Sequence, residues 1–305
     1  MDRSRDGRPA AGAPPRLLCI FGIARSGSNY LCSILANQPL IEGRFEIFNR
    51  IRSNFMRPEE LVELARRSGE TFPPVTEDAD AIRVIRADPT RTLDCLRDMV
   101  PPDKRLFTFK VLRQQLRVRQ LRDEIIARPD TAIAILRRRP IDAYISRRKA
   151  TRLRLWAEVD TTDLKIEIEA RDFLAWWRAT ADWYWRVERE CWRQRKPFQR
   201  LSYEDDIDVA PELLVRRLQS LLAASGAAEA MGPGIGPPTR FVRQDRAPAA
   251  EQRVANWPDF HRELSATGEA WKAFAPFPCF TPSWRDRRRR FLRPLLRRLR
   301  SAIAR

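Results

Sequence analysis

Apolar residues follow two patterns along the chain. The run at 16–23 is continuously apolar, which is typical of a strand buried on both faces of a sheet, and further strands are expected at 105–111, 131–136 and 199–203. Elsewhere apolar residues recur every three or four positions, which predicts helices at 28–38, 58–68, 89–99, 116–127, 140–155, 164–195 and 211–224. Strands that alternate with helices predict an α/β fold with a doubly wound, central parallel sheet flanked by helices.

The longest predicted helix, 164–195, is rich in aromatic residues. Six apolar residues share one face of it: Phe173, Trp176, Trp177, Tyr184, Val187 and Cys191. A stripe at helical spacing indicates a face that packs on the core. A second interpretation is that Trp183 or Trp185 stacks on a sugar.

The two ends of the chain differ from the rest in composition. Residues 1–15 are rich in Arg, Pro, Gly and Ala without periodicity, which predicts a disordered basic arm. Residues 285–305 hold ten arginines and one acid, with leucines on one side of a predicted amphipathic helix or tail. Such a helix is typical of contact with an anionic membrane surface. Packing on the body, or a disordered end, is the alternative. Residues 16–284 are expected to form a single domain.

The net charge of +18 would attract polyanions, but it does not choose among them. About half of the surplus lies in 285–305. We find no helix-turn-helix, zinc-finger or RNP pattern, so a basic nucleic-acid-binding protein is an alternative function and nucleic acid is not the expected partner.

The cysteines, the single histidine and the lengths of the apolar stretches bear on whether the protein has disulfides, a metal site or a membrane-spanning helix. The five cysteines are scattered and never form a C-x-x-C pair, which predicts reduced thiols rather than disulfides or a zinc site. A single histidine, His261, excludes a metal site with two histidine ligands. No apolar stretch reaches the roughly 18–20 residues of a membrane-spanning helix, and 17–24 is interpreted as a strand rather than a signal peptide. We therefore expect a cytoplasmic protein.

The segment from Gly22 to Tyr30 joins the first strand to the first helix. A glycine turn at a helix start points several backbone N–H groups at one place, where the helix dipole adds positive potential. Side-chain donors accompany the second glycine, Gly27, and they are Arg25, Ser26, Ser28 and Asn29. This indicates a phosphate-binding loop, and hence a P-loop type of sheet, with an ordinary glycine turn as the alternative. It is not a Walker A loop, because no Lys-Ser/Thr pair follows Gly27.

A second candidate anion site lies at 136–146. Arg138 would end a strand, Pro140 suits the first turn of a helix, and Ser146 lies about two turns further on. Arg138 and Ser146 can then face one anion at the carboxyl edge of the sheet, where open α/β sheets bind ligands. Arginines at 137–139 would repel Mg²⁺, which weighs against an ATPase or kinase. A solvated basic helix is the alternative.

These two segments together resemble the sulfotransferases that use 3′-phosphoadenosine 5′-phosphosulfate (PAPS). In that family the strand–loop–helix cradles the 5′-phosphosulfate, and the pattern R-x-P-x-D-x-x-x-S holds the 3′-phosphate. Arg138, Pro140, Asp142 and Ser146 match this pattern. The closer resemblance is to the bacterial carbohydrate sulfotransferases of the trehalose and nodulation-factor types.

Further segments carry the same resemblance. The stretch 42–49 is similar to the one that holds the proposed base of the family, here Glu46, and Lys110 resembles the strand lysine that contacts the transferring sulfonate. Residues 146–156 resemble a family motif, although Lys149 stands where arginine is usual. The position that holds a catalytic histidine in the animal-type enzymes is Leu112 here, which fits the bacterial type.

The resemblance also extends to the nucleotide. Tyr203 resembles the tyrosine beside the adenine, and Tyr30 is a second candidate adenine contact. Residues 241–244 and 251–256 resemble the late loop that closes over the nucleotide, so Arg243 would join Arg138 and Ser146 on the 3′-phosphate.

The resemblance implies transfer of a sulfonate from PAPS to a hydroxyl of a carbohydrate or glycolipid, without a metal. Glu46 would be the base, which calls for a pKa raised by burial, and Arg25 and Lys110 would stabilise the leaving phosphate and the sulfonate. The alternatives are that Glu46 is a surface carboxylate paired with Arg44 or Arg50, and that the protein is a P-loop kinase. A homodimer is left open.

Overall fold

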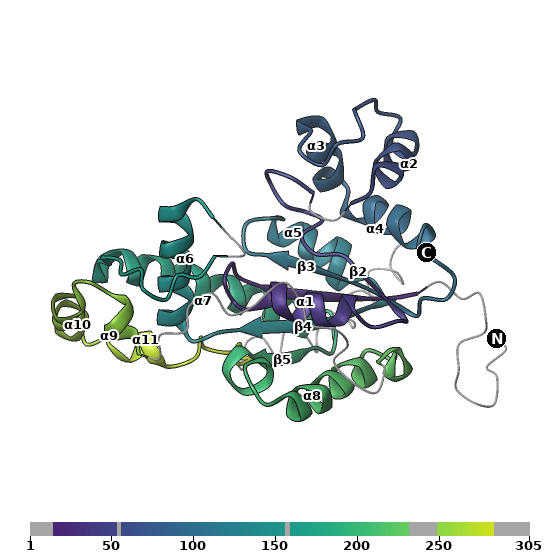
Figure 1. Ribbon diagram of the computed structural model, residues 1–305. Helices are drawn as coiled ribbons and strands as arrows, with labels where there is room; N and C mark the ends of the chain where they lie inside the picture. The colour runs from purple at the N-terminus through teal and green to yellow at the C-terminus, as the bar shows by residue number, and fades with distance from the viewer. Residues whose placement is uncertain (1–14, 54–55, 156–158, 232–248, 284–305) are drawn as a thin grey trace, which may run out of the picture.

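A five-stranded sheet forms the centre of the protein in a computed structural model that describes residues 15–53, 56–155, 159–231 and 249–283 (Figure 1). Its strands are β1 (Arg16–Gly22), β2 (Ile41–Gly43), β3 (Leu106–Leu112), β4 (Thr131–Arg137) and β5 (Gln199–Ser202). They lie in the order β2-β3-β1-β4-β5, and every neighbouring pair is parallel. The predicted α/β fold with a central parallel sheet flanked by helices is confirmed.

Helices connect the strands and follow the last one. Those before β4 are α1 (Ser28–Ala36), α2 (Pro58–Ser68), α3 (Ala79–Ala87), α4 (Pro89–Asp98), α5 (Val118–Gln120) and the π-helical turn η1 (Leu121–Ile126). Those after β4 are α6 (Pro140–Leu153), α7 (Ala170–Arg193), the π-helical turn η2 (Tyr203–Ile207), α8 (Pro211–Ala224), the 3₁₀ turn η3 (Ala228–Ala230), α9 (Ala250–Arg253), α10 (Trp257–Ala266) and α11 (Trp271–Phe274).

Two of the predicted helices differ clearly from the observed ones. The helix expected at 116–127 is divided into α5 and η1. The helix expected from 164 begins only at Ala170, because Ile166 and Ile168 alternate as buried residues of an extended segment. Ile166 pairs with Val254 in an isolated parallel bridge. The short elements β2, α3 and α9 to α11 were not predicted from the sequence.

The two faces of the sheet are covered by different helices. Leu18 and Ile20 of β1 pack with residues of α1 and α8 in one apolar cluster. The alternate residues Leu17, Cys19 and Phe21 belong to a larger cluster with residues of α2, α4, α6 and α7. In Figure 1, α9, α10 and α11 lie beyond α6 and α7, away from α2, α3 and α4. Because both faces are buried, the strands lack polar–apolar alternation, as parallel sheets do.

The aromatic stripe of α7 packs into the core, as predicted. All six of its residues are buried. Trp183 is also buried, with its ring edge-on to Phe21 at 6.3 Å between centroids. Trp185 is half-buried and packs edge-on against Phe280 at 5.3 Å. The indole rings of α7 therefore serve packing.

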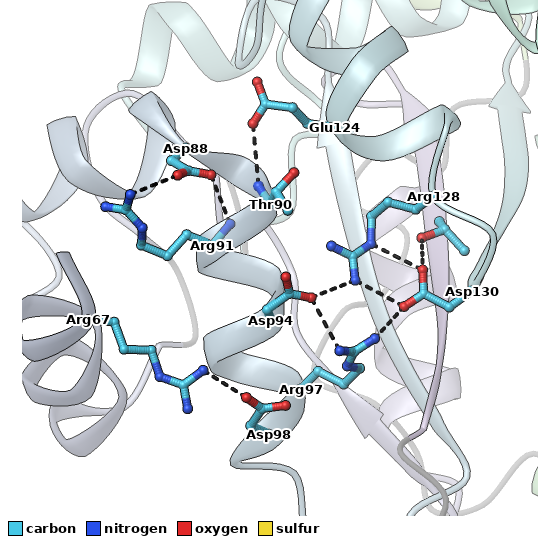
Figure 2. Close-up of polar contacts among 11 residues, drawn as sticks. Arg67, Asp88, Thr90, Arg91, Asp94, Arg97, Asp98, Glu124, Arg128 and Asp130 are labelled. Atoms are coloured by element: carbon cyan, nitrogen blue, oxygen red, sulfur yellow. Dashed lines mark hydrogen bonds and ion pairs between the residues drawn. The ribbon is translucent and has the colours of Figure 1, made fainter.

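A polar network joins α4 to the start of β4 (Figure 2). Arg128 contacts Asp94 and Asp130 at 2.7 and 2.9 Å, and Arg97 bonds to the same two carboxylates. Because Asp130 directly precedes β4, this network stabilises the amino-terminal edge of the sheet. The residues at the carboxyl edge take no part in it.

A buried carboxylate, Glu188 of α7, organises the opposite part of the sheet. It is fully buried and accepts hydrogen bonds from Arg137 at 2.6 Å and from Arg200 at 2.9 Å. The backbone N–H of Phe280 donates to it as well, at 2.7 Å. Glu188 therefore ties β4, β5 and the segment near residue 280 to one helix.

The cysteines are unpaired and the helices are too polar or too short to span a membrane, within the described residues. All five cysteines are free thiols, of which four are buried and Cys279 is exposed. None of the described helices combines the length and the apolar character needed to cross a membrane. The predicted arm at 1–15, apart from residue 15, and the predicted helix at 285–305 lie outside the described residues.

We predict that Glu188→Gln lowers the free energy of unfolding by about 3–5 kcal/mol, because it leaves the buried charge of Arg137 without a carboxylate. Asp182→Asn on the same helix is the control. Its pair with Arg186 is half-exposed at 2.8 Å, and such surface pairs contribute at most about 1 kcal/mol. Urea unfolding of both variants measures the difference, and equal losses would contradict a central role for Glu188.

Candidate functional site

The candidate site lies at the carboxyl edge of the sheet, where β1, β3, β4 and β5 end. The parallel order brings the segments that follow these strands next to each other. In particular, the loop after β1 lies between the segment after β3 and the segment after β4. This is the edge at which open parallel sheets bind ligands.

The loop after β1 has an unusual backbone. Arg25 and Gly27 both have positive φ angles, 71° and 86°. The backbone N–H and the hydroxyl of Ser26 both donate to the carbonyl of Ile23, at 3.3 and 2.8 Å. Ser26 is fully buried, so its hydroxyl closes the loop from within rather than facing a ligand. The loop is thus held in a strained conformation, which proteins usually keep at functional sites.

Tyr203, the first residue of η2, covers this loop. A Cβ atom added at Gly27 would lie 2.2 Å from Cδ2 of the Tyr203 ring, so only glycine fits there. On the same ring lies the guanidinium group of Arg138, 4.5 Å from the centroid. The loop, the end of β4 and the end of β5 therefore form one packed unit.

Two predicted cations, Arg25 and Arg138, meet in this unit. Nε of Arg25 donates to Oγ of Ser146 at 2.9 Å, and Nη1 of Arg138 donates to the carbonyl of Arg25 at 2.9 Å. Burial, and then the nearby charge of Arg138, lowers the pKa of Arg25 from 12.5 to about 10, while Tyr203 acts in the opposite direction. A bound anion would relieve this repulsion. The arrangement is therefore suited to a phosphate group.

Lys110 is the centre of a second group. Its side chain is 1% exposed, and its ammonium group forms an ion pair with Oε1 of Glu46 at 3.0 Å. It also donates to Oγ of Ser28 at 3.3 Å and to Oδ1 of Asn29. Lys110 thus links β3, the first turn of α1 and the loop that carries Glu46.

Glu46 is held by three donors. Besides Lys110, its Oε2 accepts from Nδ2 of Asn49 at 2.7 Å and from Nε2 of Gln115 at 2.8 Å. Burial by itself raises the pKa of this carboxyl, but the charge and hydrogen bond of Lys110 and the bonds from Asn49 and Gln115 outweigh it and leave the pKa below 4.5. The expectation of a raised pKa is therefore wrong for this structure. Glu46 is also not paired with Arg44, which instead binds Glu42 and Glu60.

The structure thus places the predicted site residues in two groups. One contains Glu46, Lys110, Ser28 and Asn29, and the other contains Arg25, Arg138, Ser146, Tyr203 and Gly27. Tyr30 is partly buried and packs against the apolar cluster of α1 and α8. Arg243 lies outside the described residues.

Asp142 matches the family pattern but turns away from this site. Its carboxylate pairs with Arg253 of α9, and more distantly with Arg139 at 3.5 Å. Lys149 is buried and donates to the carbonyl of Thr161 at 2.7 Å. Both residues therefore hold segments that follow α6 in the chain, rather than an anion.

One site residue, Gln115, was missed by sequence reasoning. Its Oε1 accepts from the backbone N–H of Leu112 at 2.8 Å, which fixes the Nε2 that donates to Glu46. The preceding residue, Gln114, has a positive φ of 80°. Nothing local in the sequence marks this turn. Among the described residues, no three His, Cys, Asp or Glu side chains gather into a group that could hold a metal ion.

Comparison with known proteins gave two structural neighbours of interest. No protein-family model and no curated protein matches the chain. A sulfotransferase from Alicyclobacillus acidocaldarius is 16% identical and aligns over 86% of this chain and 94% of its own, with a TM-score of 0.39. The sulfotransferase STF1 from Mycobacterium tuberculosis H37Rv is 12% identical, over 72% and 71%, with a TM-score of 0.37. At this similarity, the activity has to be argued from the residues of the site.

We predict that Gly27→Ala destabilises the protein by about 1–3 kcal/mol more than Gly268→Ala, because the new methyl group displaces the ring of Tyr203. Gly268 is a matched control: its φ is also positive, at 70°, but nothing lies within 4 Å of an added Cβ. Both variants share the backbone strain, so urea unfolding isolates the contact with Tyr203. Equal losses would show that the ring does not press on Gly27.

Proposed function

We propose that this protein is a PAPS-dependent sulfotransferase that moves a sulfonate from PAPS to a hydroxyl group of a carbohydrate or glycolipid. The observation that carries the proposal is the meeting of Arg25, Arg138 and Ser146 beside the strained loop after β1. A nucleotide with phosphates at both the 5′ and 3′ positions needs two anion sites at one sheet edge, and this pair of segments offers them.

The side chains present fit such a nucleotide. The loop after β1 suits the 5′-phosphosulfate. Only glycine fits at its position 27, Ser28 and Asn29 lie at the start of the helix, and Lys110 lies beside them. Arg25, whose pKa is lowered by burial and by the charge of Arg138, would stabilise the leaving phosphate, and Arg138 and Ser146 would hold the 3′-phosphate. The remaining predicted contacts are Arg243 on that phosphate and Tyr30 and Tyr203 on the adenine. When bound, PAPS supplies the sulfonate and a phosphate leaving group.

Glu46 is the proposed base for the acceptor hydroxyl. Its lowered pKa keeps the carboxylate ionised at neutral pH, so it is ready to accept a proton. Three donors fix the position of Glu46. A fixed position is the main requirement where the protein accelerates the reaction by orienting the reacting groups. Lys110 supplies a buried positive charge next to the loop, where negative charge develops on the leaving phosphate and on the sulfonate.

Two further parts of the proposal lie away from the site. We propose that the enzyme acts in the cytoplasm, and that residues 285–305 bring it to an anionic membrane where a glycolipid acceptor would lie. The charge of that segment supports this role, because ten of its residues are arginines.

We predict that adenosine 3′,5′-bisphosphate, the product nucleotide, stabilises the protein without any metal, and more than AMP, ADP or ATP do. At about 100 times its Kd, a ligand adds about 2.7 kcal/mol to the free energy of unfolding. Arg138→Gln should abolish the effect, whereas Arg139→Gln should not, because the Arg139 side chain is exposed and turned to Asp142. Thermal unfolding of the wild-type protein with each of the four nucleotides, and of both variants with the bisphosphate, measures these differences. Stronger stabilisation by ATP with Mg²⁺ would favour the kinase instead.

We predict that Glu46→Gln lowers kcat for sulfonate transfer roughly 10²- to 10⁴-fold and leaves binding of the bisphosphate unchanged. The exposed Glu59→Gln is the control. Since the pKa of Glu46 lies below 4.5, the wild-type rate should stay level around neutral pH and fall as the pH drops through that lowered pKa. Turnover of Glu46→Gln near the wild-type rate would remove Glu46 from the mechanism.

A further inference from the structure

Arg86 and two nearby arginines, Arg50 and Arg117, lie close to the residues that hold Oε2 of Glu46. Half-buried Arg86 donates from Nε and Nη2 to the carbonyl of Gln115, at 3.1 and 3.0 Å. Gln115 in turn donates its side-chain amide to Oε2 of Glu46. Arg86 is therefore connected to the proposed base through a single residue.

The other two arginines flank the same contact. Arg50 follows Asn49, whose amide bonds Oε2 of Glu46 and whose Oδ1 accepts from the backbone of Ile51 at 2.9 Å. Arg117 lies two positions after Gln115. Both arginine side chains are exposed. The two oxygens of Glu46 thus have different partners. Oε1 pairs with Lys110, whereas Oε2 accepts from Asn49 and Gln115, which are close in the chain to Arg50 and Arg117.

Among the described residues, no carboxylate forms an ion pair with Arg50, Arg86 or Arg117, whereas exposed arginines elsewhere, such as Arg66 and Arg83, do have such partners. Burial, and then the charges of Arg50 and Arg117, lowers the pKa of Arg86 below 12.5. Like charges held together without an anion destabilise a protein and attract anions. The group is therefore an anion-binding surface beside the proposed base.

We propose that the acceptor is itself anionic, and that Arg50, Arg86 and Arg117 bind a carboxylate, sulfate or phosphate group located near the hydroxyl that Glu46 deprotonates. This inference rests on the proposed sulfotransferase function and names its substrate class. The nucleotide would use the other cations, because Arg25 and Arg138 lie together with Ser146 and Tyr203. The arginine group next to Oε2 is then left for the acceptor.

The test uses full-length protein and three sugar probes: cellobiose, cellobiouronic acid and glucose 6-phosphate. The first is neutral, and the other two distinguish a carboxylate from a phosphate. Calorimetry with and without adenosine 3′,5′-bisphosphate, at one low salt concentration, gives the affinities. We expect one of the charged probes to bind roughly tenfold or more tightly than cellobiose, since hydrogen bonds to charged groups are the strong ones.

The variant is the double substitution Arg50→Gln with Arg117→Gln, which leaves the hydrogen bonds of Arg86 to Gln115 in place. We expect it to bind charged and neutral probes alike. The control, Arg148→Gln with Arg152→Gln, removes the same charge from a solvent-open cavity of about 460 Å³ along α6 and should keep the preference. Loss of the preference in the control variant alone would overturn the proposal, because the anion would then bind in that cavity.

The two proposals fail in different ways. If the bisphosphate stabilises the protein but charged and neutral probes bind equally, the anionic acceptor is overturned and the sulfotransferase is not. If the bisphosphate does not bind, the sulfotransferase function is contradicted. A preference for charged probes that disappears in the Arg50/Arg117 variant would still support the anion site.

Discussion

β1 pairs in parallel with β3 on one side and with β4 on the other, and every group of the candidate site depends on this pairing. It places the loop after β1 between Lys110 on β3 and Arg138 just after β4, which are far apart in the chain. The remaining strands extend the sheet, and Tyr203, which directly follows β5, covers Gly27. Without the parallel register, the two cationic segments would have no common edge.

Charge is handled in opposite ways in the two halves of the site. Buried Lys110 has a carboxylate partner, so both charges are maintained in a place where a lone charge would be costly. The pKa of Arg25 is instead lowered by burial and then by the like charge of Arg138. Proteins accept such local destabilisation where function requires it. The half with Lys110 and Glu46 is therefore suited to proton transfer beside a fixed positive charge. The half with Arg25 and Arg138 is suited to binding an anion from solution.

Backbone strain occurs in both halves of the candidate site. Four residues other than glycine have positive φ angles among the described residues: Arg25, Gln114, Arg154 and Arg195. Arg154 directly follows α6 and Arg195 lies two residues after the end of α7, where left-handed residues commonly end helices. Arg25 and Gln114 instead follow β1 and β3, at the carboxyl edge of the sheet. There the strain fixes the loop after β1 and the turn whose Gln115 positions Glu46.

The sequence by itself determined the order and type of the main elements, because buried strands, amphipathic helices and glycine or proline turns are local signals. It also identified both cationic segments and the candidates Glu46 and Lys110. The tertiary structure decided how they interact: Lys110 lowers the pKa that burial alone would raise, Asp142 holds Arg253, and Ser26 closes its own loop. These outcomes depend on which side chains meet across the sheet, and residues far apart in the chain leave no local pattern that predicts their contacts.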